Sequence, residues 1–242
     1  MDYDDFLELV KRRRSIRKFR PDPIPDENVD RIIEAARWAP SGANTQPWEF
    51  IVVREKDLKD GIVQIISEVM SQDLRMAAGQ RPGQVPDRRR PHFSPSDIAR
   101  APVFILLIGD TRMRALMPLP MPSDWMWQLI FVSSLANAFM YMQLAATSLG
   151  LASRWLTIVN RPPVQSRLKK LLGVPAEMEV YDMMLVGYPD EEPRPKLVRN
   201  REEMVHYDYC REEDFRSIEK INEFINRLMN LLTMSPDIKQ VK

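Results

Sequence analysis

Apolar residues recur along the chain in two patterns, a helical spacing and the short continuous runs of buried strands. Helical spacing predicts helices at residues 3–11, 26–36, 58–70, 127–149, 162–172 and 213–232. Apolar runs predict strands at residues 50–54, 102–110, 154–159 and 180–188. Neither an internal repeat nor an interdomain linker interrupts this order, so the pattern predicts one mixed α/β domain over residues 1–242.

Two of the predicted helices suggest contact with a second chain. The helix at 127–149 is apolar nearly all round, which is typical of a central helix or a subunit interface. Gln128, Asn137 and Gln143 interrupt it, so we interpret it as a buried helix and expect no membrane partner. The last helix follows a proline-rich turn and has an apolar stripe, which predicts a C-terminal arm at 213–242.

The segment at 71–100 lacks a clear period. It carries several prolines and the run Arg88-Arg89-Arg90. Loops of that length are usually functional or disordered, so we interpret the segment as a lid or surface flap.

The composition of the chain limits which binding partners and which cellular compartment we expect. With 44% apolar residues and a formal charge of +1, the chain gives no reason to expect a nucleic-acid partner. A single cysteine and an acidic N-terminus, "MDYDDFLELV", predict a cytoplasmic protein without an export signal. Two histidines and one cysteine predict that there is no metal site, and His92 and His206 are not assigned to catalysis.

A basic cluster, "RRRSIRK", occupies residues 12–18. Arginine forks match phosphate oxygens with paired hydrogen bonds, so the cluster is a candidate phosphate site. A solvated basic face at a helix end is the alternative. A glycine-rich dinucleotide fingerprint and a P-loop motif are both absent from the sequence.

A second cluster, "APSGANTQPWEF", occupies residues 39–50 and is long for a helix–strand connection. Its hydroxyl and amide side chains both donate and accept hydrogen bonds, and Gly42 lets a planar group approach the backbone. A flat heteroaromatic ring would suit this set. Turns that end a helix and begin a strand are the alternative.

Together, "RRSIRKF" and "AARWAPSGANTQPWEFIVV" closely resemble the FMN-dependent nitroreductase family. The resemblance extends more weakly to "LAATSLGLASRW" and "REEMVHYD", and covers most of the chain apart from residues 71–100 and the tail after residue 232. It implies an α+β fold with a central, mostly antiparallel sheet of four to five strands surrounded by helices. It also implies an intertwined homodimer.

The resemblance assigns cofactor-binding roles residue by residue. The residues implied to hold the FMN phosphate and ribityl chain are Arg13, Arg14, Ser15 and Arg17, with Arg199 reaching the phosphate late in the chain. The residues implied to meet the isoalloxazine from the partner subunit are Pro40, Ser41, Gly42 and Asn44, with Gln46 nearby. Thr157 is implied to present backbone near flavin N5. One departure is Tyr141, near which the family often carries an asparagine.

The implied function is that of an FMN-dependent oxidoreductase. It would pass a hydride from NAD(P)H via flavin N5 to an electron-poor small molecule such as a nitroaromatic or quinone, with no catalytic side chain. Two alternatives stay open. One is a specialised member, such as an iodotyrosine dehalogenase or the enzyme that fragments FMN to make the cobalamin lower ligand; the other is a non-catalytic flavin-binding module.

Overall fold

A computed structural model describes residues 2–80, 95–116 and 123–233, with backbone alone at 73–80. The described residues form two compact units, one ending at Glu192 and the other beginning at Pro193. Each is described by itself below. The single domain of residues 1–242 stays a prediction.

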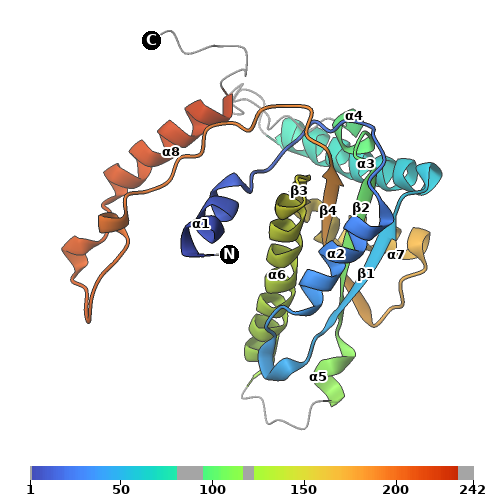
Figure 1. Cartoon of the computed structure of the whole chain (residues 1–242), viewed down its shortest axis with the longest axis horizontal. Helices are drawn as coiled ribbons and strands as arrows, with labels where there is room; N and C mark the ends of the chain where they lie inside the picture. The colour runs from blue at the N-terminus through green and yellow to red at the C-terminus, as the bar shows by residue number, and fades with distance from the viewer. Residues whose placement is uncertain (1, 81–94, 117–122, 234–242) are drawn as a thin grey trace. The chain divides into compact units, whose positions relative to one another are not determined.

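The first unit is built on a four-stranded antiparallel sheet (Figure 1). In spatial order the strands are β1 (Trp48–Val53), β2 (Val103–Asp110), β4 (Met178–Gly187) and β3 (Ala152–Leu156). β2 is buried from its first residue through Gly109, because both of its faces are covered, and this explains its continuous apolar sequence. The α+β class and the antiparallel sheet predicted from the sequence are confirmed.

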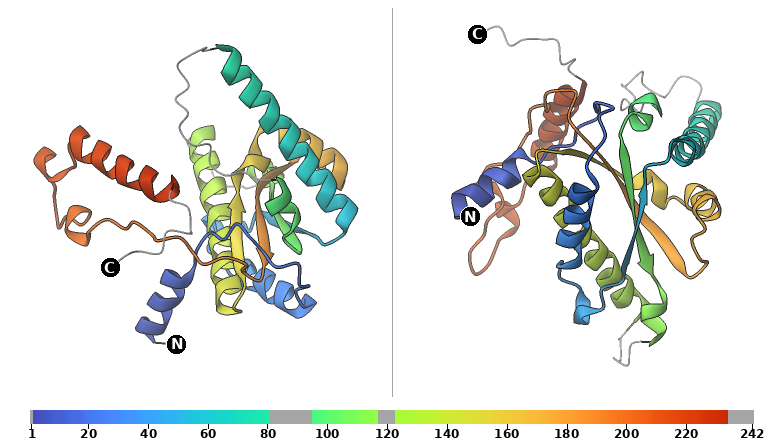
Figure 2. Two further views of the ribbon diagram at one scale, coloured as in Figure 1. Left: turned by 90° about the horizontal axis from the view of Figure 1, so that it is seen from above. Right: turned by 45° about the vertical axis from the view of Figure 1, so that its right-hand side comes forward.

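Helices cover both faces of this sheet, as the right-hand view of Figure 2 shows. One face packs against α3 (Lys56–Gln80), α4 (Pro95–Ala99) and α7 (Pro162–Leu172). The opposite face packs against α2 (Asp26–Arg37) and α6 (Asp124–Ser148). The remaining helices of this unit are α1 (Tyr3–Arg12) and α5 (Arg112–Leu116).

α6 is buried on one side only. Phe131, Leu135 and Phe139 lie in the core, whereas Trp125 is 68% exposed and Leu129 is 48% exposed. Within the described residues, α6 alone is long and apolar enough to cross a membrane, and 44% of its most apolar window is buried in the protein. The core helix of a globular protein can be equally long and apolar, so the length of α6 is weak evidence for a membrane span.

Several predicted boundaries were wrong. The helix predicted at 213–232 begins only at Ile218. α3 continues past Met70 to Gln80, so the first part of the predicted flap is helical. The added residues are mostly good helix formers, and the single Gly79 does not stop them. The predicted strand at 154–159 ends at Leu156, where pairing with β4 stops, and a 3₁₀ turn, η2 (Thr157–Asn160), follows. Of the rest of the predicted flap, 81–94 lies outside the described residues, and 95–99 forms the short helix α4.

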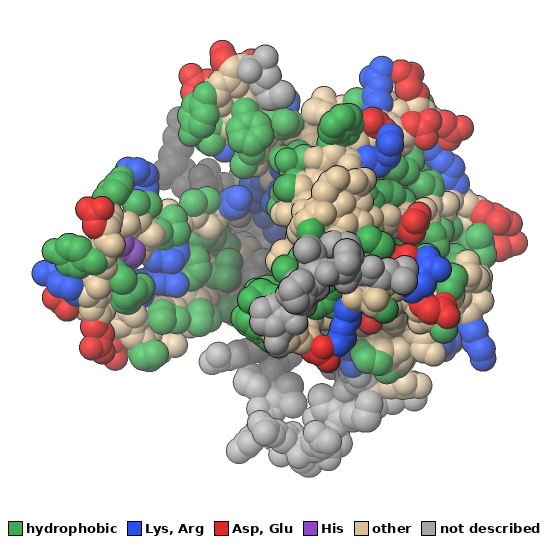
Figure 3. Space-filling view, turned by 90° about the horizontal axis from the view of Figure 1, so that it is seen from below, with side chains coloured by type: hydrophobic (Ala, Val, Ile, Leu, Met, Phe, Trp, Pro, Cys, Tyr) green, Lys and Arg blue, Asp and Glu red, His purple; other side chains and the backbone are tan. Residues whose placement is uncertain are grey.

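The second unit contains two 3₁₀ turns, η3 (Arg201–Glu203) and η4 (Glu212–Asp214), followed by α8 (Ile218–Thr233). The apolar side chains of its last part are largely exposed: Phe215 at 57%, Ile218 at 68% and Ile225 at 46%. Green hydrophobic side chains accordingly reach the surface in Figure 3. Such a stripe is typical of a surface that another protein segment covers.

One carboxyl group is buried in the sheet without full compensation. Asp182 on β4 is 3% exposed, and burial raises its pKa to about 7. The indole of Trp155 opposes that shift, yet its geometry falls short of a hydrogen bond. Neither Trp155 Nε1 nor Asp182 Oδ1 has a partner within the described chain. Asp182 therefore keeps its proton up to neutral pH in the folded protein.

We expect Asp182→Asn to stabilise the protein increasingly as pH rises from about 4 to about 7. Over that range the unfolded wild type ionises Asp182 while the folded wild type does not, so wild-type stability falls. The gain of the variant should reach about 4 kcal/mol at most. Urea unfolding of both proteins at pH 5, 6 and 8 measures it, and a difference independent of pH would contradict this account.

Candidate functional site

The basic segment after α1 lies against the outer edge of β3. The Arg13 N–H donates to the Leu9 carbonyl at 3.1 Å and ends the helix. Ser15 then pairs with Ser153 in a parallel bridge, and the Ile16 N–H donates to the Ser153 carbonyl at 3.1 Å. This pairing extends the sheet and fixes the backbone that carries the arginines on either side.

The segment gathers positive charge in a partly desolvated place. Arg13 and Arg14 are both half-buried, and burial, followed by the charge of Arg14, lowers the pKa of Arg13. Opposite Ser15, the Ser153 side chain is 2% exposed, and its Oγ has no hydrogen-bond partner within the described chain. Guanidinium groups and hydroxyls are donors that a phosphate dianion accepts from. The donor set therefore fits a phosphate better than it fits a solvated face.

Glu191 anchors the backbone of Arg17. Its Oε1 accepts from the Arg17 N–H and, at 3.3 Å, from the Lys18 N–H. Two residues further on, Phe19 is fully buried and pairs with Pro189. Arg17, which is half-buried, is thus held between two fixed points of the backbone.

The loop at 39–48 has an unusual backbone. Ala43, Asn44 and Gln46 have φ angles of 50°, 54° and 46°. Non-glycine residues rarely adopt this left-handed region, and such strain concentrates at functional sites. The Gln46 N–H donates to the Ser41 hydroxyl at 3.0 Å, which closes the loop on itself. Asn44 and Gln46 remain exposed, so their amides face outward.

Contacts with α6 hold this loop in place. The Gly42 N–H donates to the Ser134 hydroxyl at 3.1 Å, and Asn137 Nδ2 donates to the Pro40 carbonyl at 3.1 Å. A Cβ on Gly42 would lie 2.1 Å from Ile130 Cγ2, so only glycine fits there. Residues 130, 134 and 137 follow one stripe of the helix, which therefore acts as the platform for the loop.

One chain does not bring the loop and the basic segment together. The loop contacts α6 near Ser134, whereas the basic segment pairs with Ser153, just after α6 ends at Ser148. At about 1.5 Å per residue, the helix rises about 21 Å from Ser134 to Ser148. In Figure 1 the loop accordingly lies at the lower end of α6 and the start of β3 at its upper end.

Thr157 shares the β3 edge with the basic segment. It is the exposed first residue of η2, directly after β3. Because the segment at 15–17 runs parallel to β3, Ser15 and Thr157 lie at opposite ends of one edge, about 13 Å apart along the strand. An extended ligand could follow this edge from one end to the other.

Arg199 belongs to the second unit. Its guanidinium donates to the Glu203 carbonyl at 2.6 Å, and its Nε lies 3.8 Å from the Glu203 carboxylate. His206 is exposed and lies beside Phe215, with ring centroids 5.4 Å apart. Contact between Arg199 and a phosphate stays a prediction.

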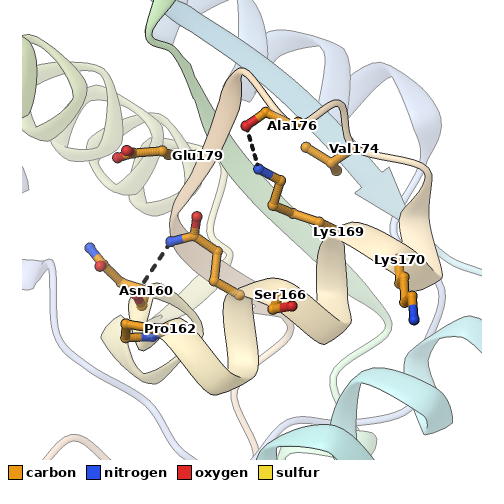
Figure 4. Close-up of a pocket in the computed structure, with 9 residues that line it drawn as sticks. Asn160, Pro162, Ser166, Lys169, Lys170, Val174, Ala176 and Glu179 are labelled. Carbon is orange, nitrogen blue, oxygen red and sulfur yellow. Dashed lines mark hydrogen bonds between the residues drawn. The ribbon is translucent and has the colours of Figure 1, made fainter.

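A cavity of about 710 Å³ lies elsewhere in the first unit, between α7 and the start of β4 (Figure 4). Lys169 crosses it and donates to the carbonyls of Ala176 at 2.8 Å and Met178 at 2.6 Å. These bonds tie the loop after α7 to the helix. The cavity contains none of the predicted cofactor-binding residues.

A model of the nitroreductase family matches residues 10–188, which span the basic segment, the loop and all four strands. The chain belongs to the nitroreductase family. The resemblance drawn from the sequence is confirmed.

Several relatives are known by name. Iodotyrosine deiodinase 1 of Rattus norvegicus is 32% identical over 191 residues, which cover 78% of this chain and 64% of the rat protein. A putative NADH dehydrogenase/NAD(P)H nitroreductase of Archaeoglobus fulgidus is 30% identical over 189 residues, covering 78% of this chain and 88% of the relative. This nitroreductase-family chain therefore spans less than two thirds of the rat protein's length and most of the archaeal protein's length.

Solved structures agree on the fold. The FMN-dependent nitroreductase of Clostridium difficile R20291 has a TM-score of 0.60 at 26% identity, covering 84% of this chain and 99% of its own. The NADPH:FMN oxidoreductase of Vibrio harveyi has a TM-score of 0.69 at 21% identity, covering 93% and 85%. The second likeness supports the nitroreductase fold alone.

Sequence reasoning missed the residues of α6 that hold the loop. The departure noted at Tyr141 pointed to a lost polar contact from this helix. Asn137 lies one helical turn before Tyr141, and its side-chain amide donates a hydrogen bond to the Pro40 carbonyl. Ser134 was the available signal, because it is a polar residue on the buried side of the helix and a buried polar side chain needs a partner. Asn137 is exposed and gave no such signal.

Proposed function

We propose that this chain binds FMN and passes a hydride from NAD(P)H, via flavin N5, to an electron-poor small molecule such as a nitroaromatic or quinone. The observation that carries the proposal is the basic segment paired with β3, where the half-buried Arg13 and Arg14 precede Ser15, and Ser15 pairs with the buried Ser153. The printed names of the archaeal relative and of the clostridial structure support the nicotinamide donor and FMN.

In this proposal the residues of the chain bind and orient the cofactor. Arg13, Arg14 and Ser15 hold the phosphate, Arg17 lies further along the β3 edge toward the ring, and Thr157 presents backbone at the far end. Bound FMN supplies the redox chemistry, so an indispensable acid or base side chain is not required.

We further propose that two chains share each flavin site. The loop and the basic segment are about 21 Å apart along α6 in one chain, so the exposed amides of the loop would serve the flavin of a partner. The exposed apolar side of α6, which includes Trp125, Leu129 and Tyr141, offers a surface for that partner. In this proposal the homodimer and the shared site rest on the same geometry.

Arg17→Ala and Arg199→Ala should each weaken FMN binding about ten- to a hundredfold, because each removes a charge-assisted hydrogen bond. Flavin fluorescence titration of the apo protein measures this. Arg31→Ala removes an exposed arginine paired with Glu27 on α2 and serves as the matched control. If the affinity for FMN were unchanged in both Arg17→Ala and Arg199→Ala, the basic segment would be a solvated surface and not a phosphate site.

The similarity to the rat deiodinase favours a second candidate, a reductive dehalogenase that uses the same flavin. Turnover of nitroaromatics, quinones, halotyrosines and oxygen by the FMN-loaded protein separates the two activities. Flavin that neither NADH nor NADPH reduces, together with no turnover of any acceptor, would instead indicate a non-catalytic binding module.

A further inference from the structure

The 3₁₀ turn η2 lies where the sheet no longer holds the chain. In the described sheet, β3 pairs with residues 183–187 of β4, and this leaves the first part of β4 without a partner strand on that side. Thr157, the first residue of η2, follows the last paired residue, Leu156. The backbone of η2 therefore needs another anchor if it is to keep one position.

Gln165 on α7 supplies that anchor. Its side-chain Nε2 donates to the Asn160 carbonyl at 3.3 Å and to the Val180 carbonyl at 3.4 Å. The two hydrogens of one amide group thus match two carbonyls, one at the end of η2 and one on the part of β4 that β3 leaves unpaired. Val159, inside the turn, is fully buried. The turn is therefore held at its start by β3, in its middle by the core and at its end by Gln165.

Lys169 makes bonds of the same kind one helical turn further along α7. Its ammonium group donates to the Ala176 carbonyl at 2.8 Å (Figure 4) and to the Met178 carbonyl at 2.6 Å. Neither carbonyl belongs to η2. Side chains four residues apart share one face of a helix, so this face of α7 holds two separate pieces of backbone. A comparison of the two residues separates an effect on η2 from a general effect on folding.

We propose that Gln165 is a positioning residue, which fixes η2 and through it the backbone of Thr157 at the flavin ring. The inference rests on the proposed function, in which Thr157 presents backbone near N5, and it adds the residue that keeps this backbone in place. Hydride transfer depends steeply on distance and alignment, whereas affinity for FMN depends on the phosphate contacts of the basic segment. Loosening η2 should therefore slow reduction of the flavin more than it weakens flavin binding.

Hydrogen exchange in the apo protein tests the anchor itself, without the cofactor. Gln165→Met keeps the length and the helix propensity of the side chain but removes both donors. It should speed amide exchange over residues 157–161 about tenfold. Lys169→Met is the matched control, and it should speed exchange over residues 174–178 instead. Gln165→Lys supplies a new donor and should restore slow exchange at η2.

Stopped-flow reduction of the FMN-loaded protein tests the link between the anchor and the flavin. In Gln165→Met the limiting rate of flavin reduction by NADH or NADPH should fall about tenfold, while the Kd for FMN should stay within about twofold of the wild-type value. In Lys169→Met and Gln165→Lys both quantities should stay close to wild type. If Gln165→Met does not fold, Gln165→Asn, which draws the amide back by one methylene group, tests the same contact.

Two results would overturn the proposal. One is exchange at residues 157–161 that Gln165→Met leaves unchanged, or that Lys169→Met raises as much, since Gln165 would then not be a specific anchor. The other is faster exchange at η2 with an unchanged rate of flavin reduction, since η2 would then not position the ring. Failure of the wild type to take up FMN, or to be reduced by either nicotinamide, would refute the proposed function itself and leave the exchange result standing.

Discussion

Gly42→Ala is expected to displace the loop at 39–48 and to lower FMN affinity at least about tenfold. The added Cβ would lie 2.1 Å from Ile130 Cγ2, far inside van der Waals contact. Ile130 is β-branched and lies in a helix, so its side chain has little freedom to turn away. Overpacking of this kind costs about 1–3 kcal/mol, and the loop also depends on the Gly42–Ser134 hydrogen bond. Flavin titration and thermal unfolding measure the two effects.

A second substitution provides the control for Gly42→Ala. Shortening Ile130 to alanine removes Cγ2 and leaves its Cβ 3.5 Å from the new methyl group, which is an ordinary contact. The double variant Gly42→Ala/Ile130→Ala should therefore bind FMN better than Gly42→Ala alone. If Gly42→Ala kept full affinity, or if the double variant gave no recovery, steric fit against α6 would not be what positions the loop.

Truncation before Glu213 is expected to abolish dimerisation and most FMN retention together. The removed segment carries the exposed side chains of Phe215, Ile218 and Ile225, a stripe that suits burial against a partner chain. A ligand held only by the dimer is linked to association by mass action, so the two losses should occur together. Light scattering should give about twice the 28.3 kDa chain mass for the full-length protein, and the mass of a single shortened chain for the truncated one.

Charged substitutions separate the stripe from a general effect of deletion. Ile218→Glu with Ile225→Glu should weaken the dimer in the full-length chain. Arg227→Glu, which lies on the opposite side of α8 by helical periodicity, should not. A well-folded, truncated monomer that retains its flavin fully would show that the stripe has another purpose.

The main strands and helices could be predicted because their apolar residues form continuous runs or recur at a helical period. The apolar run of β2 and the all-round apolar α6 left little choice of structure. The end of β3 was not predictable, because "LTIV" reads equally well as strand. It becomes a 3₁₀ turn only where the partner register on β4 ends, at Met183. Long-range pairing decided that boundary, and local propensity did not.

The candidate site was predictable in composition but not in conformation. Family motifs identified the loop and the basic segment, yet the left-handed backbone at Ala43 has no local signal, since alanine rarely adopts it. The role of Ser153 was likewise hidden, because its pairing with Ser15 joins segments far apart in the sequence. Tertiary contacts impose both features.

Subunit complementation tests the central claim, that each FMN site is shared by two chains. One variant would carry Arg13→Ala and Arg17→Ala, and the other Gly42→Ala, at an FMN concentration that fills the wild type but neither variant. After subunit exchange in an equimolar mixture, about half of the dimers should combine both chains and contain one intact site each, which restores about a quarter of wild-type FMN binding. Binding no greater than the average of the two separate variants would contradict the account, because both clusters would then serve a site within one chain.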